Sequence, residues 1–259
     1  MPSDPHGSLG ARLAKYPCFD FELFVDPSDR TASPIVHHGI YEHHIMPIFS
    51  QTVKPGMRVL DIGANIGVYA VAAARIGAEV TAIDASTENC KLIALNAKLN
   101  GVSVEILPMA VSDTFGMALF GRTNESNKVI RSFDLAPHTF DLLDASFAAP
   151  VDAILGDRRI DLVKIDIEGR EHAALKNADK LFAHRPIFFL EYADNMSRAG
   201  SGVAGAELLK LFTERGYKMM VIGLRGPNVE CGNDIAMVDR IAAEELEAGI
   251  TITDLLLTP

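Results

Sequence analysis

The segment at residues 58–67, RVLDIGANIG, joins an apolar run to an acidic residue and two glycines. A strand, a glycine turn and a helix in this order let a ligand approach the backbone closely. The middle glycine of the dinucleotide pattern G-x-G-x-x-G is missing, and the acid would lie close to the pyrophosphate that this glycine admits. A carboxylate is better matched to an ammonium group. S-adenosylmethionine carries such a group, and the residues predicted to contact it here are Asp61, Gly63, Asn65 and Gly67.

Further polar residues follow the next two predicted strands. Asp84 and Ala85 end the second strand, where an acid can accept both hydroxyls of a ribose. Ser112 and Asp113 follow the third strand, where a polar side chain can reach an adenine amino group. Each feature alone has a structural explanation, because G-x-x-x-G often marks a tight turn and a strand-end acid often caps a helix. Their order along one βαβαβ run favours the cofactor interpretation.

Acidic residues at the ends of the fourth and fifth strands are candidates for acid–base chemistry. In-line methyl transfer requires an enzyme to position the acceptor and to remove its proton. Asp166 ends the fourth strand, at the sheet edge where such folds bind ligands, and we expect it to contact the cofactor as well. Glu168 and His172 follow it, and Glu191 ends the fifth strand. Asp166 is the preferred general base.

Simpler roles compete with catalysis for several of these side chains. Glu168 and Glu171 could complement a helix dipole, an effect worth about 0.3–1 kcal/mol each. His172 has an ordinary pKa near neutrality and suits a general base, but an exposed helical histidine fits the sequence equally well. Lys164 lies between apolar strand residues and is expected to pair with a nearby acid.

A metal site is an alternative that the sequence does not favour. Asp194 and Asn195 follow the fifth strand and, with Asp166, are similar to the Asp plus Asp-Asn set of catechol-type O-methyltransferases, which holds a divalent cation such as Mg²⁺. Asp-Asn pairs are also common in turns. The histidine pairs at 37–38 and 43–44 could bind a transition metal, but no Cys or Asp lies at a compact spacing from them. We expect these imidazoles to face the acceptor instead.

Short apolar β-rich runs alternate with helical spacing from residue 58 onward, which predicts a parallel sheet covered by helices on both faces. The predicted strands are 58–62, 79–84, 104–109, 161–166, 186–192, 218–223 and 254–259. The predicted helices are 68–76, 88–100, 171–182, 206–215 and 238–248. The expected fold class is α/β, a Rossmann-like sheet of seven mostly parallel strands with an N-terminal helical appendage.

Two segments depart from this alternation. Residues 1–53 form the predicted appendage, with a strand at 21–25, a helix at about 41–53 and a lid function, and residues 54–259 form the cofactor-binding domain. An insertion at 110–160 is expected to hold a hairpin starting at 117–121, with a turn rich in Asn, Ser and Thr, and a helix near 140–147.

Composition limits the classes of partner. The 259 residues include 34 acidic and 24 basic side chains, for a net charge of −10, whereas nucleic-acid binding requires clustered Lys and Arg. We therefore expect a small-molecule or saccharide acceptor and no nucleic acid. The three cysteines form no CxxC pair, and neither a signal peptide nor an apolar run of about 18 residues is present. These features predict a cytoplasmic protein without membrane association.

Several motifs together resemble the FkbM family of class I S-adenosylmethionine-dependent methyltransferases. They are Tyr41-Glu42, LDIGANIGVYA (60–70), LNAKLNGV (95–102), LVKIDIEGREHAALKNA (162–178) and RPIFFLEY (185–192). The second strand departs from the family, ending Ile83-Asp84-Ala85 where a Glu-Pro pair is usual. The resemblance covers about residues 40–223 and implies methyl transfer, usually to an oxygen of a sugar or secondary metabolite, without identifying the acceptor.

Two other function classes remain open at this point. An NAD-dependent oxidoreductase is disfavoured by the missing middle glycine and by the position of Asp61. A non-catalytic cofactor-binding protein of the same fold would not need the strand-end acids Asp61, Asp84 and Asp166. The leading hypothesis is therefore a small-molecule O-methyltransferase.

Overall fold

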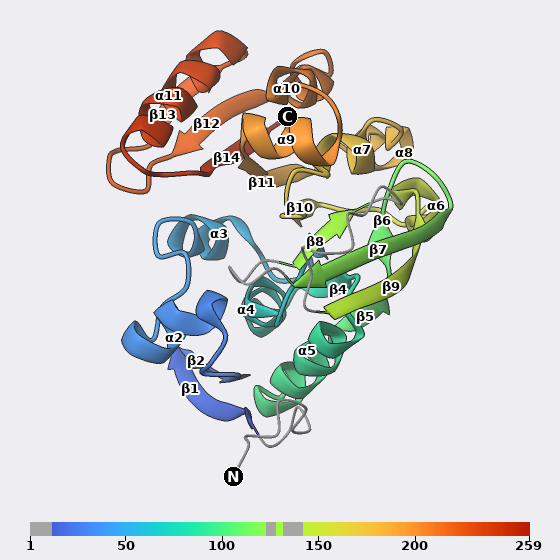
Figure 1. Cartoon of the computed structure of the whole chain (residues 1–259), viewed down its shortest axis with the longest axis vertical. Coiled ribbons are helices and arrows are strands. Elements are labelled where there is room, and N and C mark those ends of the chain that lie inside the picture. The colour runs from blue at the N-terminus through green and yellow to red at the C-terminus, as the bar shows by residue number, and fades with distance from the viewer. Residues whose placement is uncertain (1–11, 123–127, 132–141) are drawn as a thin grey trace.

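The computed structural model describes residues 12–122, 128–131 and 142–259, and an eight-stranded sheet forms its centre (Figure 1). In spatial order the strands are β13 (Val229–Gly232), β12 (Lys218–Ile222), β14 (Thr253–Thr258), β11 (Ile187–Tyr192), β10 (Leu162–Ile165), β3 (Arg58–Ile62), β4 (Glu79–Asp84) and β5 (Glu105–Pro108). The strands from β11 to β5 are parallel to one another, whereas β14 is antiparallel to both of its neighbours. The predicted mostly parallel α/β sheet is confirmed, with one strand more than expected. The additional strand, β13, is a short edge strand whose sequence, VECG, has no extended apolar run.

Two hydrophobic clusters cover the two faces of this sheet. Successive strand residues point to opposite faces, and Phe188 packs in one cluster while Phe189 packs in the other. Val221 and Ile222 of β12 divide in the same way. The central strands are therefore buried on both sides, which explains their continuous apolar sequences.

The helices cover both faces of the sheet (Figure 1). They are α2 (Ser33–His38), α3 (Met46–Thr52), α4 (Val68–Ile76), α5 (Thr87–Leu99), α6 (Val151–Leu155), α7 (Glu171–Leu175), α8 (Asp179–Ala183), α9 (Asp194–Gly200), α10 (Gly205–Thr213) and α11 (Ile235–Glu247), with a 3-10 turn at Arg30–Ala32. The single helix predicted at 171–182 is wrong, because two short helices, α7 and α8, occupy this range. The carboxylate of Asp152 accepts hydrogen bonds from the backbone N–H groups of Lys180 and Leu181 at 2.8 and 3.1 Å and so satisfies the separate start of α8. No helix in the described part of the chain has the length and apolar character needed to cross a bilayer.

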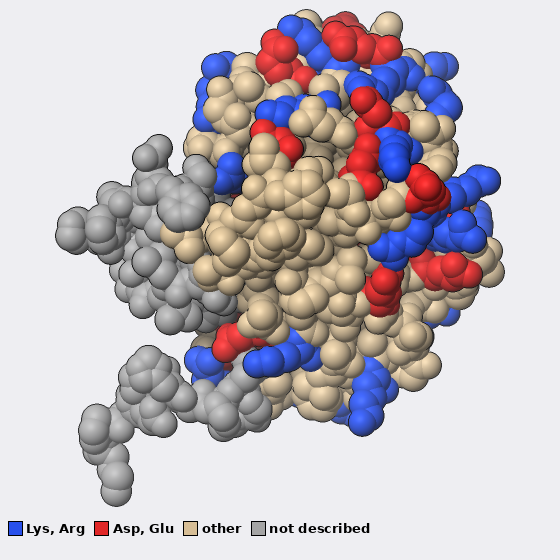
Figure 2. All heavy atoms as spheres, turned by 90° about the vertical axis from the view of Figure 1, so that its right-hand side faces the viewer, with Lys and Arg blue, Asp and Glu red and all other residues tan. Residues whose placement is uncertain are grey.

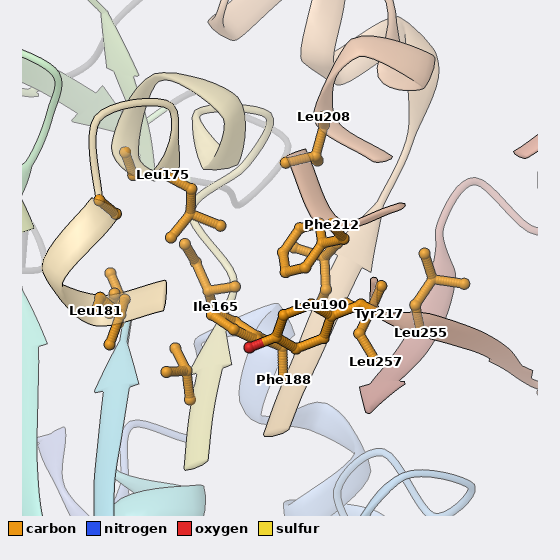
Figure 3. Close-up of a cluster of buried hydrophobic side chains, with 14 of the residues drawn as sticks. Ile165, Leu175, Leu181, Phe188, Leu190, Leu208, Phe212, Tyr217, Leu255 and Leu257 are labelled. Atoms are coloured by element: carbon orange, nitrogen blue, oxygen red, sulfur yellow. The ribbon is translucent and has the colours of Figure 1, made fainter. Parts of the chain in front are cut away.

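An aromatic group forms the centre of one hydrophobic cluster (Figure 3). The rings of Phe188 and Phe212 meet edge to face with centroids 4.9 Å apart, and Tyr217 lies 5.6 Å from Phe212. The Tyr217 hydroxyl donates a hydrogen bond to the Pro186 carbonyl at 3.0 Å, which satisfies the polar end of a fully buried ring. These contacts hold α10 against β11, the strand that ends in Glu191 and Tyr192.

The N-terminal segment packs on α4 and α5. Its strands β1 (Ala14–Cys18) and β2 (Phe21–Val25) form a hairpin that confirms the strand predicted at 21–25. Asn96 of α5 accepts a hydrogen bond from the Phe24 N–H at 2.7 Å, and Phe49 of α3 packs against Tyr69 and Phe189. The helix predicted at 41–53 is shorter, starting at Met46, because residues 41–45 form turns.

The insertion forms a four-stranded sheet in the order β6-β9-β7-β8. Its strands are β6 (Ala110–Val111), β7 (Gly116–Arg122), β8 (Lys128–Arg131) and β9 (Leu142–Ala149). The predicted hairpin is confirmed by the antiparallel pairing of β7 with β8, and its turn at 123–127 lies outside the described residues. The helix predicted near 140–147 is wrong over its described part, where the alternating burial of residues 145–148 has the period of a strand.

Candidate active site

A pocket of about 330 Å³ opens at the carboxyl ends of β3, β4, β10 and β11. Parallel strands bring their carboxyl ends to one edge, so residues distant in sequence meet there. The predicted site residues that line the pocket are Asp61, Gly63, Asn65, Asp84, Ala85, Asp166, Glu168 and Glu191.

The glycine turn after β3 is fixed by steric contact. Gly63 has φ +81°, and a Cβ atom added to it would lie 1.8 Å from the backbone oxygen of Asp166. No larger residue fits between the two loops without moving one of them. Gly67 has φ +86° and precedes α4, where an added Cβ would contact Ile93 at 3.2 Å. Gly67 therefore positions the helix and does not itself line the pocket.

Asp61 presents a buried oxygen without a protein partner. Its side chain is 2% exposed, and Oδ2 makes no hydrogen bond. Burial raises the pKa of Asp61 to about 7, although the ammonium of Lys164 opposes this shift. A buried polar atom of this kind is normally satisfied, so the pocket fits a ligand that donates a hydrogen bond and carries positive charge here.

Asp84 is oriented by hydrogen bonds from its own loop and from the glycine turn. Its Oδ2 accepts from the Asn65 N–H at 2.8 Å, and its Oδ1 accepts from the Ser86 N–H at 2.8 Å and from Asn89 Nδ2 at 3.1 Å. Asn65 reaches this position with φ +51°, a conformation that Asn tolerates better than most residues. The structure thus links the two predicted cofactor-binding turns directly.

Asp166, Glu168 and Glu191 surround the other side of the pocket with Lys164. Lys164 is 2% exposed, and its Nζ lies 3.6 Å from Asp166 Oδ2, which agrees with the predicted ion pair. Burial lowers the pKa of Lys164, but the carboxylates of Asp166 and Glu42 outweigh this effect and raise it overall. Lys164 therefore stays protonated and cannot act as a base.

The two glutamates favour their neutral forms. Burial, followed by the charge of Asp166, raises the pKa of Glu168 to about 7. The same two causes raise the pKa of Glu191 well above its ordinary value. The carboxyl oxygen Oε2 of Glu191 is buried without a partner.

Residues not predicted as site residues also line the pocket, and they include Tyr41, Glu42, Tyr69 and Lys164. The hydroxyl of Tyr69 donates a hydrogen bond to the carboxylate of Glu42, which has φ +43°. The Lys164 ammonium lies 5.3 Å from the centroid of the Tyr69 ring. Tyr41 and Glu42 belong to the segment predicted to act as a lid, but no local sequence pattern places them beside β10.

Several predicted residues do not reach the pocket. Ser112 donates a hydrogen bond to Asp113, which pairs with Lys176 at 2.5 Å. Met109, Ala110 and Val111 line the pocket in their place. His172 lies on α7 and does not line the pocket, so the structure does not support it as the base.

The alternative metal set is not assembled. Asp194 pairs with Arg198 at 2.7 Å and accepts a hydrogen bond from the Gly205 N–H, and neither it nor Asn195 lines the pocket. Of the N-terminal histidines, His44 contacts Asp254 at 2.8 Å. No group of three His, Cys, Asp or Glu side chains among the described residues is arranged to hold a metal ion.

Comparison with known proteins identifies the family. The model of the methyltransferase FkbM domain matches residues 61–219, more than half of the chain. The chain belongs to the FkbM methyltransferase family. The matched range includes the glycine turn and every strand-end acid described above, whereas Tyr41 and Glu42 precede it.

Curated relatives of this FkbM family member share a shorter segment. The chain is 45% identical over 56 residues to ribosomal protein L11 methyltransferase of Desulfitobacterium hafniense, which covers 22% of the chain and 18% of that protein. It is 38% identical over 76 residues to ubiquinone biosynthesis O-methyltransferase of Xanthomonas campestris pv. campestris, covering 29% of the chain and 32% of that protein. The chain thus matches less than a third of the length of either relative.

Solved structures confirm the Rossmann-like methyltransferase fold of the FkbM chain. Pyrococcus abyssi tRNA (uracil-54, C5)-methyltransferase, in complex with S-adenosyl-L-homocysteine, has a TM-score of 0.51 at 11% identity, over 96% of this chain and 44% of that chain. Methanocaldococcus jannaschii Trm5, in complex with adenosine, has a TM-score of 0.50 at 12% identity, over 95% and 56%. The family confirms S-adenosylmethionine as the cofactor, and the unpartnered oxygen of Asp61 fits its ammonium group.

Proposed function

We propose that this chain transfers a methyl group from S-adenosylmethionine to a hydroxyl oxygen of a small neutral or cationic acceptor, such as a saccharide or secondary metabolite. The observation that carries the proposal is the pocket itself, in which the unpartnered Oδ2 of Asp61 and the acid pair Asp166 and Glu191 share one cavity. One cavity thus offers a site for an amino-acid group and a site for a proton. An NAD-dependent oxidoreductase would not need the site for an amino-acid group.

The cofactor would lie across the carboxyl ends of β3, β4 and β5. Asp61 accepts hydrogen bonds from the ammonium group, and Gly63 leaves room for close approach of the backbone. Asp84, oriented by Asn65, Ser86 and Asn89, accepts the ribose hydroxyls. Residues 109–111, which line the pocket, would border the adenine. When bound, the cofactor supplies an electrophilic methyl group on a positively charged sulfur.

Asp166 is the proposed general base. Its Oδ2 lies 3.6 Å from the ammonium of Lys164, and its side chain lines the pocket together with Glu191. Asp166 can therefore accept the proton of an acceptor hydroxyl as the new O–C bond forms. This role requires no metal ion.

The N-terminal segment is proposed to close the acceptor side of the pocket. Tyr41 and Glu42 line the cavity, and Phe49 anchors the following helix between Tyr69 and Phe189. Residues 36–53 would thereby exclude water from the reaction, as lids do in other transferases. The division into a 1–53 lid and a 54–259 domain is part of this proposal.

Charge supports a small acceptor over a nucleic acid. Seven of the residues that line the pocket are acidic, and Lys164 is the one basic residue among those described. Phosphate groups would be repelled there. On the face drawn in Figure 2, Lys and Arg side chains are interspersed with Asp and Glu around an uncharged area and do not form a continuous basic surface.

Calorimetry with purified full-length protein tests the proposal. S-adenosylmethionine should bind the wild type, NAD should not compete, and Asp61→Asn should weaken binding at least tenfold. Asp157→Asn, which alters an exposed aspartate paired with Lys180, is the matched control and should change nothing. Tight NAD binding, or unchanged affinity in Asp61→Asn, would contradict the proposed function.

A further inference from the structure

Asp166 and Glu191 form a pair of neighbouring carboxyl groups, and their proximity affects whether both can be ionised. They directly follow Ile165 and Leu190, which are paired in the neighbouring parallel strands β10 and β11, and both line the pocket. Two carboxylates that share one buried site oppose each other's ionisation, and burial together with the charge of Asp166 raises the pKa of Glu191. We therefore expect the ligand-free pocket to hold one proton on this pair.

The surroundings of this pair explain why the proton is retained. Glu191 is 9% exposed, and its Oε2 is buried without a partner although Glu191 lines the pocket. The titratable and charged groups around the pair are Lys164 of β10, Glu168 after β10, Tyr41 and Glu42 before α3, Asp61 of β3, and Asp254 of β14, which is paired with Glu191 in the sheet and contacts His44. Most of them are acidic, so a second negative charge on the pair is opposed until a cation enters.

The proposed cofactor position brings such a cation to the pair. Its sulfur joins the amino-acid end, placed at Asp61, to the ribose, placed at Asp84. The backbone oxygen of Asp166 is packed against Gly63, two residues after Asp61. The sulfonium charge would thus enter the part of the pocket that Asp166 borders.

We propose that the Asp166–Glu191 pair distinguishes S-adenosylmethionine from S-adenosylhomocysteine by charge, releasing its shared proton when the sulfonium binds and retaining it beside the neutral thioether. This inference rests on the proposed function of the same pocket. It gives the pair a second role, because release of the proton prepares both carboxylates before the acceptor reacts.

The reaction then conserves the charge of the site. The S–CH₃ bond breaks with its electron pair left on sulfur, an O–CH₃ bond forms, and the acceptor's hydroxyl proton passes to the Asp166–Glu191 pair. One positive charge disappears from sulfur as one negative charge disappears from the pair. The protonated pair matches the neutral product, so the cofactor-bound and product-bound states are both balanced.

The two ligands provide a test that needs no acceptor. Calorimetric titration of the wild type at pH 7 in phosphate and in Tris, buffers with different ionisation enthalpies, measures proton release. Binding of S-adenosylmethionine should release up to about one proton more than binding of S-adenosylhomocysteine. Because one linked proton changes affinity up to tenfold per pH unit, the ratio of the two dissociation constants should also shift up to tenfold in favour of S-adenosylmethionine from pH 6 to pH 7.

Variants assign the proton to the pair. Glu191→Gln should remove both the difference in proton release and the pH dependence of the ratio, with affinity for S-adenosylhomocysteine changed less than threefold. Glu168→Gln, at the same pocket, and Glu79→Gln, at the opposite end of β4 and paired with Arg58, should keep both effects.

The calorimetric results distinguish failure of this inference from failure of the proposed function. Equal proton release for the two ligands in the wild type would overturn the inference while leaving cofactor binding intact. Loss of the effects in Glu168→Gln but not in Glu191→Gln would also overturn it, because the proton would belong to Glu168. If neither ligand binds the wild type, the proposed function itself fails.

Discussion

Asp61→Asn is expected to stabilise the ligand-free protein while it weakens cofactor binding. Burial, opposed by Lys164, raises the pKa of Asp61 from 3.8 to about 7. Because each pKa unit corresponds to about 1.36 kcal/mol, burial of ionised Asp61 lowers the free energy of unfolding by about 4 kcal/mol above pH 7. The amide of Asn removes the charge but leaves a polar group to satisfy, and we expect a gain of about 1–4 kcal/mol.

The pH dependence of this gain follows from the sign of the shift. The folded state binds the Asp61 proton more tightly than the unfolded state does. The destabilisation is therefore absent below about pH 4, grows between about pH 4 and pH 7, and is complete above about pH 7. At pH 5 the destabilisation of the folded state is only about 1.5 kcal/mol. Urea denaturation of wild type and variant at pH 5 and pH 8 therefore measures a larger difference at pH 8.

Two outcomes would refute this reasoning. A variant less stable than the wild type at pH 8 would show that burial of the ionised Asp61 carboxylate does not destabilise the folded state. A variant with unchanged affinity for S-adenosylmethionine would show that its carboxylate does not hold the ammonium group. Asp157→Asn, on the exposed surface, should shift stability by less than about 0.5 kcal/mol at both pH values.

Three further substitutions test other parts of the site. Asp84→Ala should weaken S-adenosylmethionine binding by about 1.5–3 kcal/mol, the range for lost hydrogen bonds to a charged group, and unchanged calorimetric affinity would remove the ribose assignment. Gly63→Ala should destabilise the fold by at least about 2 kcal/mol in urea, because the new Cβ would lie 1.8 Å from the Asp166 oxygen, whereas Gly101→Ala, with open space at φ +67°, should cost only about 1 kcal/mol. Asp166→Asn should keep the thermal midpoint and most cofactor affinity but lower methyl transfer about 10²–10⁴-fold, and chelator should leave the wild-type rate unchanged; wild-type rates in the variant would remove Asp166 as the base.

The strand-end acids were predictable because two simple rules apply to them. Continuous apolar runs mark the central strands, and parallel strands bring their carboxyl ends to one edge. Asp61, Asp84, Asp166 and Glu191 follow such runs, and all four line the pocket. Which strand neighbours which did not need to be known.

Residues positioned by tertiary packing were not predictable in this way. Glu42 reaches the pocket because Phe49 anchors α3 on Tyr69, a contact that no local pattern indicates. Asp113 is drawn from the pocket by Lys176, which lies far along the chain. The helix predicted near 140–147 is wrong because a short, largely apolar sequence suits both helix and strand, and pairing with β7 decides for β9.

The most direct test of the central claim is methyl transfer from methyl-labelled S-adenosylmethionine into a cell extract separated into small-molecule, RNA and protein fractions. The account predicts that the wild type labels small neutral or cationic compounds at a hydroxyl oxygen, and that Asp61→Asn and Asp166→Asn do not. Label confined to RNA or protein, or equal labelling by Asp166→Asn, would contradict it.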